Sequence, residues 1–390
     1  MFFFPSENFL QTVEPTAAAL FRRDFRLAQK DVQSGVSTGR ARSACTHWRQ
    51  WRIFTDSLAI DPFLETIDDK VPLLQVFARR LRTGELSPSR NSLRSRSVED
   101  YVRSIGQTFL QLGLNDPRLG PDLKQDHRLT RMWRCYSKAD PPPDRVKPVP
   151  VQVIRHIMTI AMASQDEVLI ATADMIALAF FFLLRPGEYT DSPSDTKPFQ
   201  FQDIQVFSGP QRLNLQTAST AQLQAATFVS LTFTEQKNGV RGEVIGLSRS
   251  GNPALCPVAS LVRRICHLRQ HNAAPTTPLA RAFDGTRWMK ITPAAITRAL
   301  RDAVTFLSPA SLGFLPSDVS ARCLRAAGAN ALLCANIDTD IIRLLGRWRS
   351  DEMLRYLHLQ AAPVMQNFSR AMLSGGHFTL IPNQLVPQQP

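Results

Sequence analysis

Apolar residues recur at intervals of three and four positions in the first third of the chain, the period of a helix with one buried face. Four such stripes lie at residues 39–58, 71–84, 97–113 and 128–138. The second has Pro72 near its start and Gly84 just past its end, an asymmetry typical of helices. In the third, we expect Ser97 and Asp100 to cap the N-terminus. No alternating strand pattern precedes residue 140, so this part predicts a small helical domain.

Helical stripes return after a segment at residues 141–150 whose prolines favour extended backbone. They lie at residues 151–161, 166–184, 256–271, 292–307, 319–336, 338–346 and 350–361. Three strand-like segments stand among them, at residues 202–207, 226–234 and 243–250. The pair Asn238 and Gly239 between the last two is a strong hairpin signal. We predict a polar loop at residues 208–225.

The fold class that follows is mainly α-helical with a small three-stranded antiparallel sheet. The length of 390 residues suffices for two separate cores. We expect a loosely ordered arm at residues 1–38, a helical domain at 39–140, a linker at 141–150, a second domain at 151–375 and a disordered tail at 376–390.

The net charge of the chain indicates what kind of partner it binds. Forty-six Lys and Arg against 33 Asp and Glu give a net charge of +13. The isoelectric point near 10.0 favours a polyanion such as DNA, although an ordinary basic protein is an alternative at this point. In the helical domain, the candidates for phosphate contacts are Arg40, Arg42, Arg94 and Arg96.

Cysteine usage and hydropathy exclude other classes. The six cysteines form no C-x-x-C pair and no histidine cluster joins them, so we expect neither a metal site nor a disulfide framework, and an intracellular protein. The opening segment lacks the basic lead and long apolar run of a signal peptide. The apolar run 168–185 contains Asp174 and ends in Arg185, so we predict a buried helix and no membrane partner.

The candidate chemistry centres on Tyr356. A phenol ionises near pH ~10, so it attacks only where fixed cations stabilise the developing charge. Arg325 precedes Tyr356 by 31 positions, and Arg347 and Trp348 precede it by nine and eight. We expect Gly346 to end a helix in a left-handed conformation and to project the two residues after it. A core position is the alternative for Trp348 and for Tyr356.

Three further cations complete the set. Arg185 follows the apolar run and precedes Glu188, with which we expect it to pair; its alternative role is to cap the helix. Lys237 lies in the predicted hairpin, where a solvated turn lysine is the alternative. Arg322 stands three positions before Arg325, so we expect both side chains to share a helix face.

These segments, in this order, resemble the catalytic end of the tyrosine recombinases, the phage-integrase superfamily. The matching elements are 183–191 (LLRPGEYTD), Lys237, 322–325 (RCLR), 346–350 (GRWRS) and Tyr356. The similarity covers residues 150 to 372, and the helical domain fits that family's core-binding domain by position and class. Within the superfamily, the Crypton-type transposon recombinases are most similar.

The resemblance implies a reaction on double-stranded DNA. Tyr356 would attack a phosphodiester to give a 3′-phosphotyrosine, with arginines in place of a metal and no cofactor. Lys237 would protonate the leaving 5′ oxygen, and either Arg347 or Trp348 would donate to a non-bridging oxygen. The implied catalytic residues are Tyr356, Arg185, Arg325, Lys237, Arg347, Trp348 and Arg322. The family also implies a tetrameric synapse on DNA, and a nuclear protein in a eukaryotic host.

One departure keeps alternatives open. The family usually has a histidine where this chain has Arg322, and an arginine cannot take up a proton as a neutral histidine can. The acceptor of the tyrosine proton is therefore unassigned. A non-catalytic DNA-binding protein derived from a recombinase is one alternative. A type IB topoisomerase, which shares the chemistry, is another, and a generic basic helical scaffold is a third.

Overall fold

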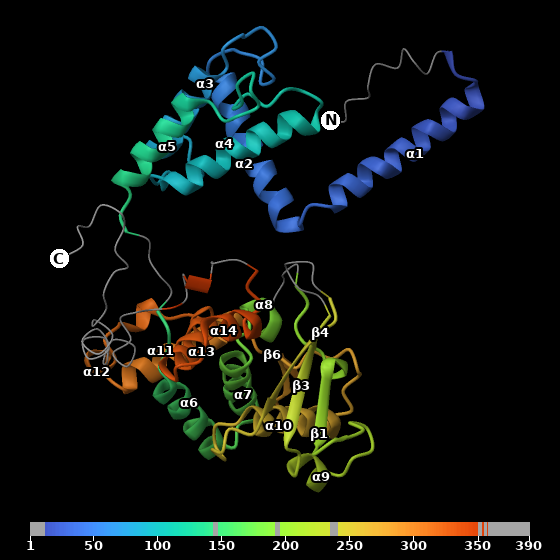
Figure 1. The fold of residues 1–390 in the computed structure, drawn as a ribbon, viewed down its shortest axis with the longest axis vertical. Helices are drawn as coiled ribbons and strands as arrows, with labels where there is room; N and C mark the ends of the chain where they lie inside the picture. Colours follow the sequence, from blue (N-terminus) through green and yellow to red (C-terminus); the bar gives the residue numbers. More distant parts are fainter. Residues whose placement is uncertain are drawn as a thin grey trace, which may run out of the picture. The chain divides into compact units, whose positions relative to one another are not determined.

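The structure is a computed structural model that describes residues 12–142, 147–191, 196–234, 241–349, 353, 354 and 357. The chain divides into two compact units, residues 1–143 and 144–390. The described residues are mainly helical with small antiparallel sheets, which confirms the predicted fold class (Figure 1).

The first unit is helical throughout its named elements. They are α1 (Pro15–Ser34), α2 (Thr38–Asp56), α3 (Val71–Thr83), α4 (Ser95–Gln111) and α5 (His127–Ala139). Its core contains Trp51, Phe54 and Phe77, whose ring centroids lie 5.1 to 5.6 Å apart. Gly84 follows the end of α3 as predicted, and its backbone is left-handed with φ 92°.

Two expectations for this unit are wrong. Residues 15–34 form helix α1 rather than a loosely ordered arm, because Pro15 suits a first helical position and the residues after it are good helix formers. Helix α4 begins earlier than Ser97, and its N-cap is Arg94 with no side-chain cap bond. Ser97 and Asp100 therefore lie inside the helix and cannot form the predicted cap.

The second unit packs helices around one sheet. Its helices are α6 (Val151–Ser164), α7 (Glu167–Phe181), α8 (Pro186–Tyr189), α9 (Thr220–Gln224), α10 (Pro257–Gln270), α11 (Pro293–Phe306), α12 (Pro309–Leu312), α13 (Cys323–Cys334) and α14 (Thr339–Leu345). Short 3-10 helices lie at Phe201–Asp203 and Pro316–Asp318. The strands are β1 (Ile204–Ser208), β2 (Gln211–Arg212), β3 (Phe228–Phe233), β4 (Glu243–Ser248), β5 (Arg281–Phe283) and β6 (Trp288–Lys290).

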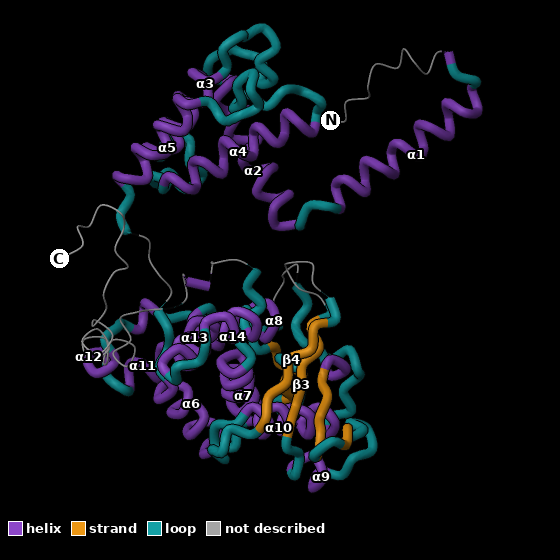
Figure 2. The backbone as a smooth tube through the Cα atoms, viewed as in Figure 1, coloured by secondary structure: helices purple, strands orange, loops and turns teal. Residues whose placement is uncertain are grey.

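The strands of the second unit are drawn in orange in Figure 2. The main sheet has the strand order β2-β1-β3-β4, and every pairing between neighbours is antiparallel. The three predicted strands are β1, β3 and β4. Strand β2 and helix α9 lie within residues 208–225, so the prediction of an unstructured loop there is wrong. The separate pair β5 and β6 was also not predicted, since strands of two or three residues are too short to show an alternating pattern.

Helix α7 is the centre of the second unit and contacts α6, α10 and α13. Its apolar residues occupy all sides rather than one stripe, which is the pattern of a fully buried helix. The buried carboxylate of Asp174 pairs with Arg263 of α10, and Asp166 caps the N-terminus. No helix in the described ranges is long and apolar enough to span a membrane.

Gly328 brings α13 against α7. A Cβ at this position would lie 2.2 Å from the carbonyl oxygen of Phe180 and 2.3 Å from a methyl group of Leu183. The two backbones therefore approach more closely than any larger residue permits. This close packing of α13 lets Arg325 reach the end of α7.

Candidate active site

The candidate site begins where α7 ends. Leu183 has a left-handed backbone with φ 51°, and this turn exposes the carbonyl oxygens at the helix end to neighbouring donors. Leu183 O accepts from Arg325 Nη1 at 3.1 Å and from Arg347 Nη2 at 3.2 Å, and Phe182 O accepts from Arg347 Nη1 at 3.2 Å. The negative end of a helix dipole favours cations. Two guanidinium groups distant in sequence therefore meet at one helix terminus.

Glu188 connects Arg347 to Arg185. Its carboxylate accepts from the backbone N of Arg185 at 2.8 Å and from Arg185 Nη1 at 3.0 Å. It also accepts from Arg347 Nη2 at 3.1 Å. The short helix α8 makes this possible, because Arg185 is its N-cap and Glu188 lies in its only turn. The expected pairing of Arg185 with Glu188 is thus present, and one buried carboxylate holds two arginines.

The turn after α14 presents Arg347 and Trp348. Trp348 N donates to Arg343 O at 3.0 Å and Arg347 N donates to Leu344 O at 2.9 Å, the two bonds of a Schellman motif. The left-handed residue is Arg347, with φ 57°, while Gly346 is right-handed with φ −77°. The predicted left-handed Gly346 is therefore wrong by one position. A side-chain-bearing residue in this region costs about 1–2 kcal/mol, and the bonds of Arg347 hold it there.

Gly346 serves a different purpose, which is to leave room for the indole. A Cβ at this position would lie 1.6 Å from Cζ3 of Trp348. The ring of Trp348 instead lies below the guanidinium of Arg325, 4.2 Å from its carbon Cζ, and Arg325 Nη2 donates to Gly346 O. The sequence Gly-Arg-Trp is thus a compact support for Arg325 and Arg347.

Burial sets the electrostatics of this arginine cluster, by which we mean Arg185, Arg325 and Arg347 with Glu188. Residues Arg325 and Arg347 are 3% and 6% exposed. Burial lowers the pKa of Arg347 to about 10, and the attraction of Glu188 opposes this shift. The Arg347 guanidinium also lies 3.8 Å from the centroid of the Phe233 ring. The buried guanidinium groups of Arg325 and Arg347 therefore brace the cluster, whereas the Arg185 side chain is 25% exposed.

Arg322 is not part of the cluster. It is the N-cap of α13 rather than a residue of its first turn, and it is exposed, whereas Arg325 is buried. The structure thus brings Arg325 into the cluster and leaves Arg322 exposed at the start of the same helix. Among the described residues, Arg322 forms no hydrogen bond or ion pair, so its guanidinium is available to a ligand.

The predicted nucleophile Tyr356 and the predicted acid Lys237 lie outside the described residues. Their described neighbours do meet the cluster. Met353 and Leu357 pack with Leu183 and Trp348 in one small apolar core. Phe233, four positions before Lys237, contacts Arg347 and accepts from Gly242 N at 2.9 Å.

The other tyrosines of the chain are unsuited to nucleophilic attack. Tyr189 is fully buried, and burial raises its pKa well above the ordinary value. Burial also raises the pKa of Tyr136 and of Tyr101, both in the first unit. Tyr356, the fourth tyrosine of the sequence, lies outside the described residues.

The proposed DNA contacts of the first unit are available to solvent. Arg40 and Arg42 lie in the first turns of α2, and Arg94 and Arg96 lie at the start of α4; all four are exposed. Within the described ranges, no group of three or more His, Cys, Asp or Glu residues could hold a metal ion. Arg185, Arg325 and Arg347 supply the positive charge of the arginine cluster.

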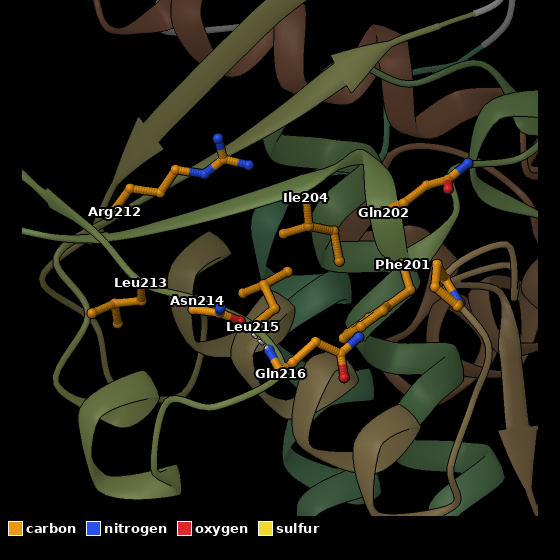
Figure 3. Close-up of a pocket in the computed structure, with 9 residues that line it drawn as sticks. Phe201, Gln202, Ile204, Arg212, Leu213, Asn214, Leu215 and Gln216 are labelled. Carbon is orange, nitrogen blue, oxygen red and sulfur yellow. Dashed lines mark hydrogen bonds between the residues drawn. The ribbon is translucent and has the colours of Figure 1, made fainter.

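A cavity of about 420 Å³ lies elsewhere in the second unit, beside β2 (Figure 3). Phe201, Ile204 and Leu213 give it apolar walls, and Gln202 and Gln216 bring amides to it. Arg212 is the one charged residue that lines it. With no acid, base or nucleophile at hand, this cavity is a poor candidate for the reacting centre, and the arginine cluster is the better one.

Sequence reasoning missed the groups that organise the cluster. The carbonyls of Phe182 and Leu183 have no sequence signal, because every residue carries one. Phe233 had a partial signal, since it ends the alternating apolar pattern of the second predicted strand.

No protein-family model and no curated protein matches this sequence. Among solved structures, the chain is similar to the XerH site-specific recombinase bound to palindromic difH substrate, a post-cleavage complex, with 12% identity, TM-score 0.47, and 80% of this chain and 73% of that chain covered. It is similar to the Tn1549 transposon integrase in complex with transposon right end DNA, with 13% identity, TM-score 0.40, and 77% and 84% covered. It is also similar to the integrase from mycobacterium phage Brujita, with 15% identity, TM-score 0.27, and 93% of this chain and 95% of that chain covered. Similarity at this level leaves residue roles to the chemistry of this chain.

Proposed function

We propose that this protein is a DNA recombinase of the tyrosine recombinase superfamily, which cuts and rejoins duplex DNA through Tyr356. The observation that carries the proposal is the convergence of three separate sequence segments. Arg185, Arg325 and Arg347 come from the ends of α7, α13 and α14, and they meet around Glu188 and Leu183 O. These are the segments whose order along the chain resembles that superfamily, and Leu357, next to Tyr356, packs beside them.

The proposed step balances as a transesterification. The Tyr356 oxygen forms a bond to phosphorus, the bond from phosphorus to the 5′ oxygen breaks, and the phosphoester energy is retained in the 3′-phosphotyrosine. The 5′ oxygen takes a proton, for which Lys237 is the proposed donor. Attack by a 5′ hydroxyl of another strand reverses the step. The reaction therefore consumes no nucleotide cofactor.

Charge stabilisation falls to the arginines, and the structure divides them by exposure. Arg185 is partly exposed and Arg322 is exposed, so both can reach the non-bridging oxygens of a phosphate. Arg325 and Arg347 direct their terminal nitrogens at carbonyls and at Glu188, so we propose that they brace the site. A preorganised donor to a developing oxyanion contributes about 3–4 kcal/mol to lowering the barrier.

Trp348 has a related supporting role. The resemblance allows Arg347 or Trp348 to donate to the phosphate, but Arg347 is 6% exposed and its Nη atoms are engaged by carbonyls and Glu188. We propose that Trp348 holds the guanidinium of Arg325 in place through its ring.

The proton of Tyr356 passes to water in this proposal, because Arg322 cannot accept it.

DNA binding without cleavage is a second candidate function, and one observation favours it. The burial of Arg325 and Arg347 leaves fewer donors for the scissile phosphate than the resemblance implies. In that case, the exposed arginines of both units would bind phosphates without reaction. Strand relaxation of the type IB topoisomerase kind is the alternative within the same chemistry.

A suicide duplex with a nick close to the cleavage site separates these functions. A recombinase becomes covalently attached to the 3′ phosphate, because the short 5′ fragment diffuses away and rejoining fails. A protein that only binds DNA gives a mobility shift but no covalent product. Joining of strands from two different duplexes supports recombination, and relaxation of supercoiled DNA without such joining supports the topoisomerase alternative.

We also propose that the active form on DNA is a tetramer and that the protein acts in the nucleus of a eukaryotic host. The tetramer follows from the resemblance to the tyrosine recombinases. The nuclear location follows from the similarity to the Crypton-type transposon recombinases. The mass of the complex on synapsed duplexes, measured by light scattering, tests the first of these.

A further inference from the structure

The backbone of Ala321, the residue before Arg322, is held by side chains of two other elements. The phenol of Tyr189, the last residue of α8, donates to Ala321 O at 2.7 Å. On the other side, Ala321 N donates to Oγ1 of Thr297 in α11 at 3.1 Å. Thr297 Oγ1 in turn donates to Pro293 O at 2.7 Å, which fixes its own direction. The backbone N–H and C=O of Ala321 are thus both bonded by side chains.

The bond from Tyr189 is well protected. Tyr189 is fully buried and Ala321 is 3% exposed, so water does not compete for the bond. Burial raises the pKa of Tyr189 well above its ordinary value, so the phenol remains a donor over any working pH. The backbone just upstream is also held, since Arg301 Nε donates to Val319 O at 3.2 Å. This segment is therefore fixed up to the residue that precedes Arg322.

Arg322 itself differs from its surroundings. The backbone before it is anchored, but its side chain is exposed and bonds to none of the described residues. Tyr189 belongs to the same short helix whose N-cap is Arg185, the other accessible arginine. The phenol therefore ties the backbone that carries Arg322 to the turn that carries Arg185.

We propose that Tyr189 is a positioning residue, which fixes the separation of Arg185 and Arg322 so that both guanidinium groups meet one DNA phosphate. The inference rests on the proposed function and adds to it the device that aligns two arginines lying 137 positions apart. Thr297 supports the preceding peptide unit, through its bond from Ala321 N. A displacement of about 1 Å in a group that stabilises a transition state can slow a reaction about 100-fold.

The test is single-turnover formation of the covalent adduct on the nicked suicide duplex, at saturating DNA. Tyr189→Phe removes only the donated hydroxyl. We expect it to slow adduct formation about 10- to 100-fold, with DNA affinity changed less than about twofold. In an Arg322→Lys background, which keeps a charge but lacks the planar fork, the same change should slow the reaction by less than about twofold.

Thr297 offers a second series. Thr297→Val removes the acceptor for Ala321 N and should slow the adduct in the same way, whereas Thr297→Ser should recover most of the rate. Thr305→Val is the matched control on α11, because Thr305 Oγ1 bonds only within its own helix, to Arg301 O at 2.9 Å, and is exposed. We expect that control to react at the wild-type rate.

Equal slowing by Tyr189→Phe in both backgrounds would overturn the inference, since the phenol would then act on the fold rather than through Arg322. An unchanged rate in the wild-type background would overturn it as well. If the wild-type chain forms no adduct, the proposed function fails and this inference fails with it. If the wild-type chain reacts, the function stands whichever way the Tyr189 variants behave.

Discussion

Replacement of Glu188 by glutamine tests the brace of the arginine cluster. The Glu188 side chain is 3% exposed, the Arg347 side chain is 2% exposed, and their polar atoms lie 3.1 Å apart. Removal of one partner from a buried ion pair typically costs about 3–5 kcal/mol, because the other charge stays buried and uncompensated. Glutamine keeps the shape and one acceptor oxygen. We therefore expect the free energy of unfolding of the second unit to fall by about 3 kcal/mol.

Urea unfolding followed by intrinsic fluorescence measures this change as a fall in the transition midpoint at constant slope. Asp340→Asn is the matched control in the same unit, since Asp340 pairs with Arg343 across an exposed helix face, with a side chain 71% exposed. Exposed pairs of this kind contribute about 0.3–0.5 kcal/mol. A loss below about 1 kcal/mol for Glu188→Gln, or a loss equal to that of the control, would contradict the role given to the buried carboxylate.

Three further predictions concern the same unit. Arg263→Ala leaves the buried Asp174 without its partner and should lower unfolding free energy by about 3 kcal/mol or more, whereas Asp174→Asn should cost less; urea unfolding compares them. Burial holds the pKa of His267 near 4, below its usual 6.5, and Phe283 N donates to its Nε2. The unfolded chain then binds more protons between pH 6.5 and 4, so stability should fall by about 2–3 kcal/mol as pH drops across that window; a His267→Gln variant should show a shallower fall in Tm. Gly346→Ala forces a methyl group into the neighbouring indole, and a loss of about 1–3 kcal/mol with altered tryptophan fluorescence is expected; wild-type Tm and emission would contradict this packing.

The helices were predictable because burial imposes a period on the sequence. Helix α7 was identified as buried from its apolar residues on every side, and α3 from its terminal proline and glycine. Strand β2 and the pair β5 and β6 were not, since two or three residues show no period. Helix α1 was missed because little of it is buried: Leu20, Phe21 and Leu27 are exposed, so no core-facing stripe marks it.

The candidate site was predictable only in its local parts. The pairing of Arg185 with Glu188 follows from a spacing of three positions. The contact of Glu188 with Arg347 spans 159 positions, and it depends on how α7, α13 and α14 pack. The left-handed residue is Arg347 rather than the predicted Gly346. The glycine at 346 instead leaves space for the indole of Trp348. Such choices are made by tertiary contacts, which a local pattern does not encode.

We propose that Tyr356 forms the covalent bond to DNA. The most direct measurement is to trap the protein on a nicked suicide duplex in the presence of a chelator, digest it, and locate the attached nucleotide by mass spectrometry. We expect a 3′-phosphate linked to Tyr356, formed without metal, and no adduct from Tyr356→Phe. An adduct on another residue, or one that persists in Tyr356→Phe, would contradict it.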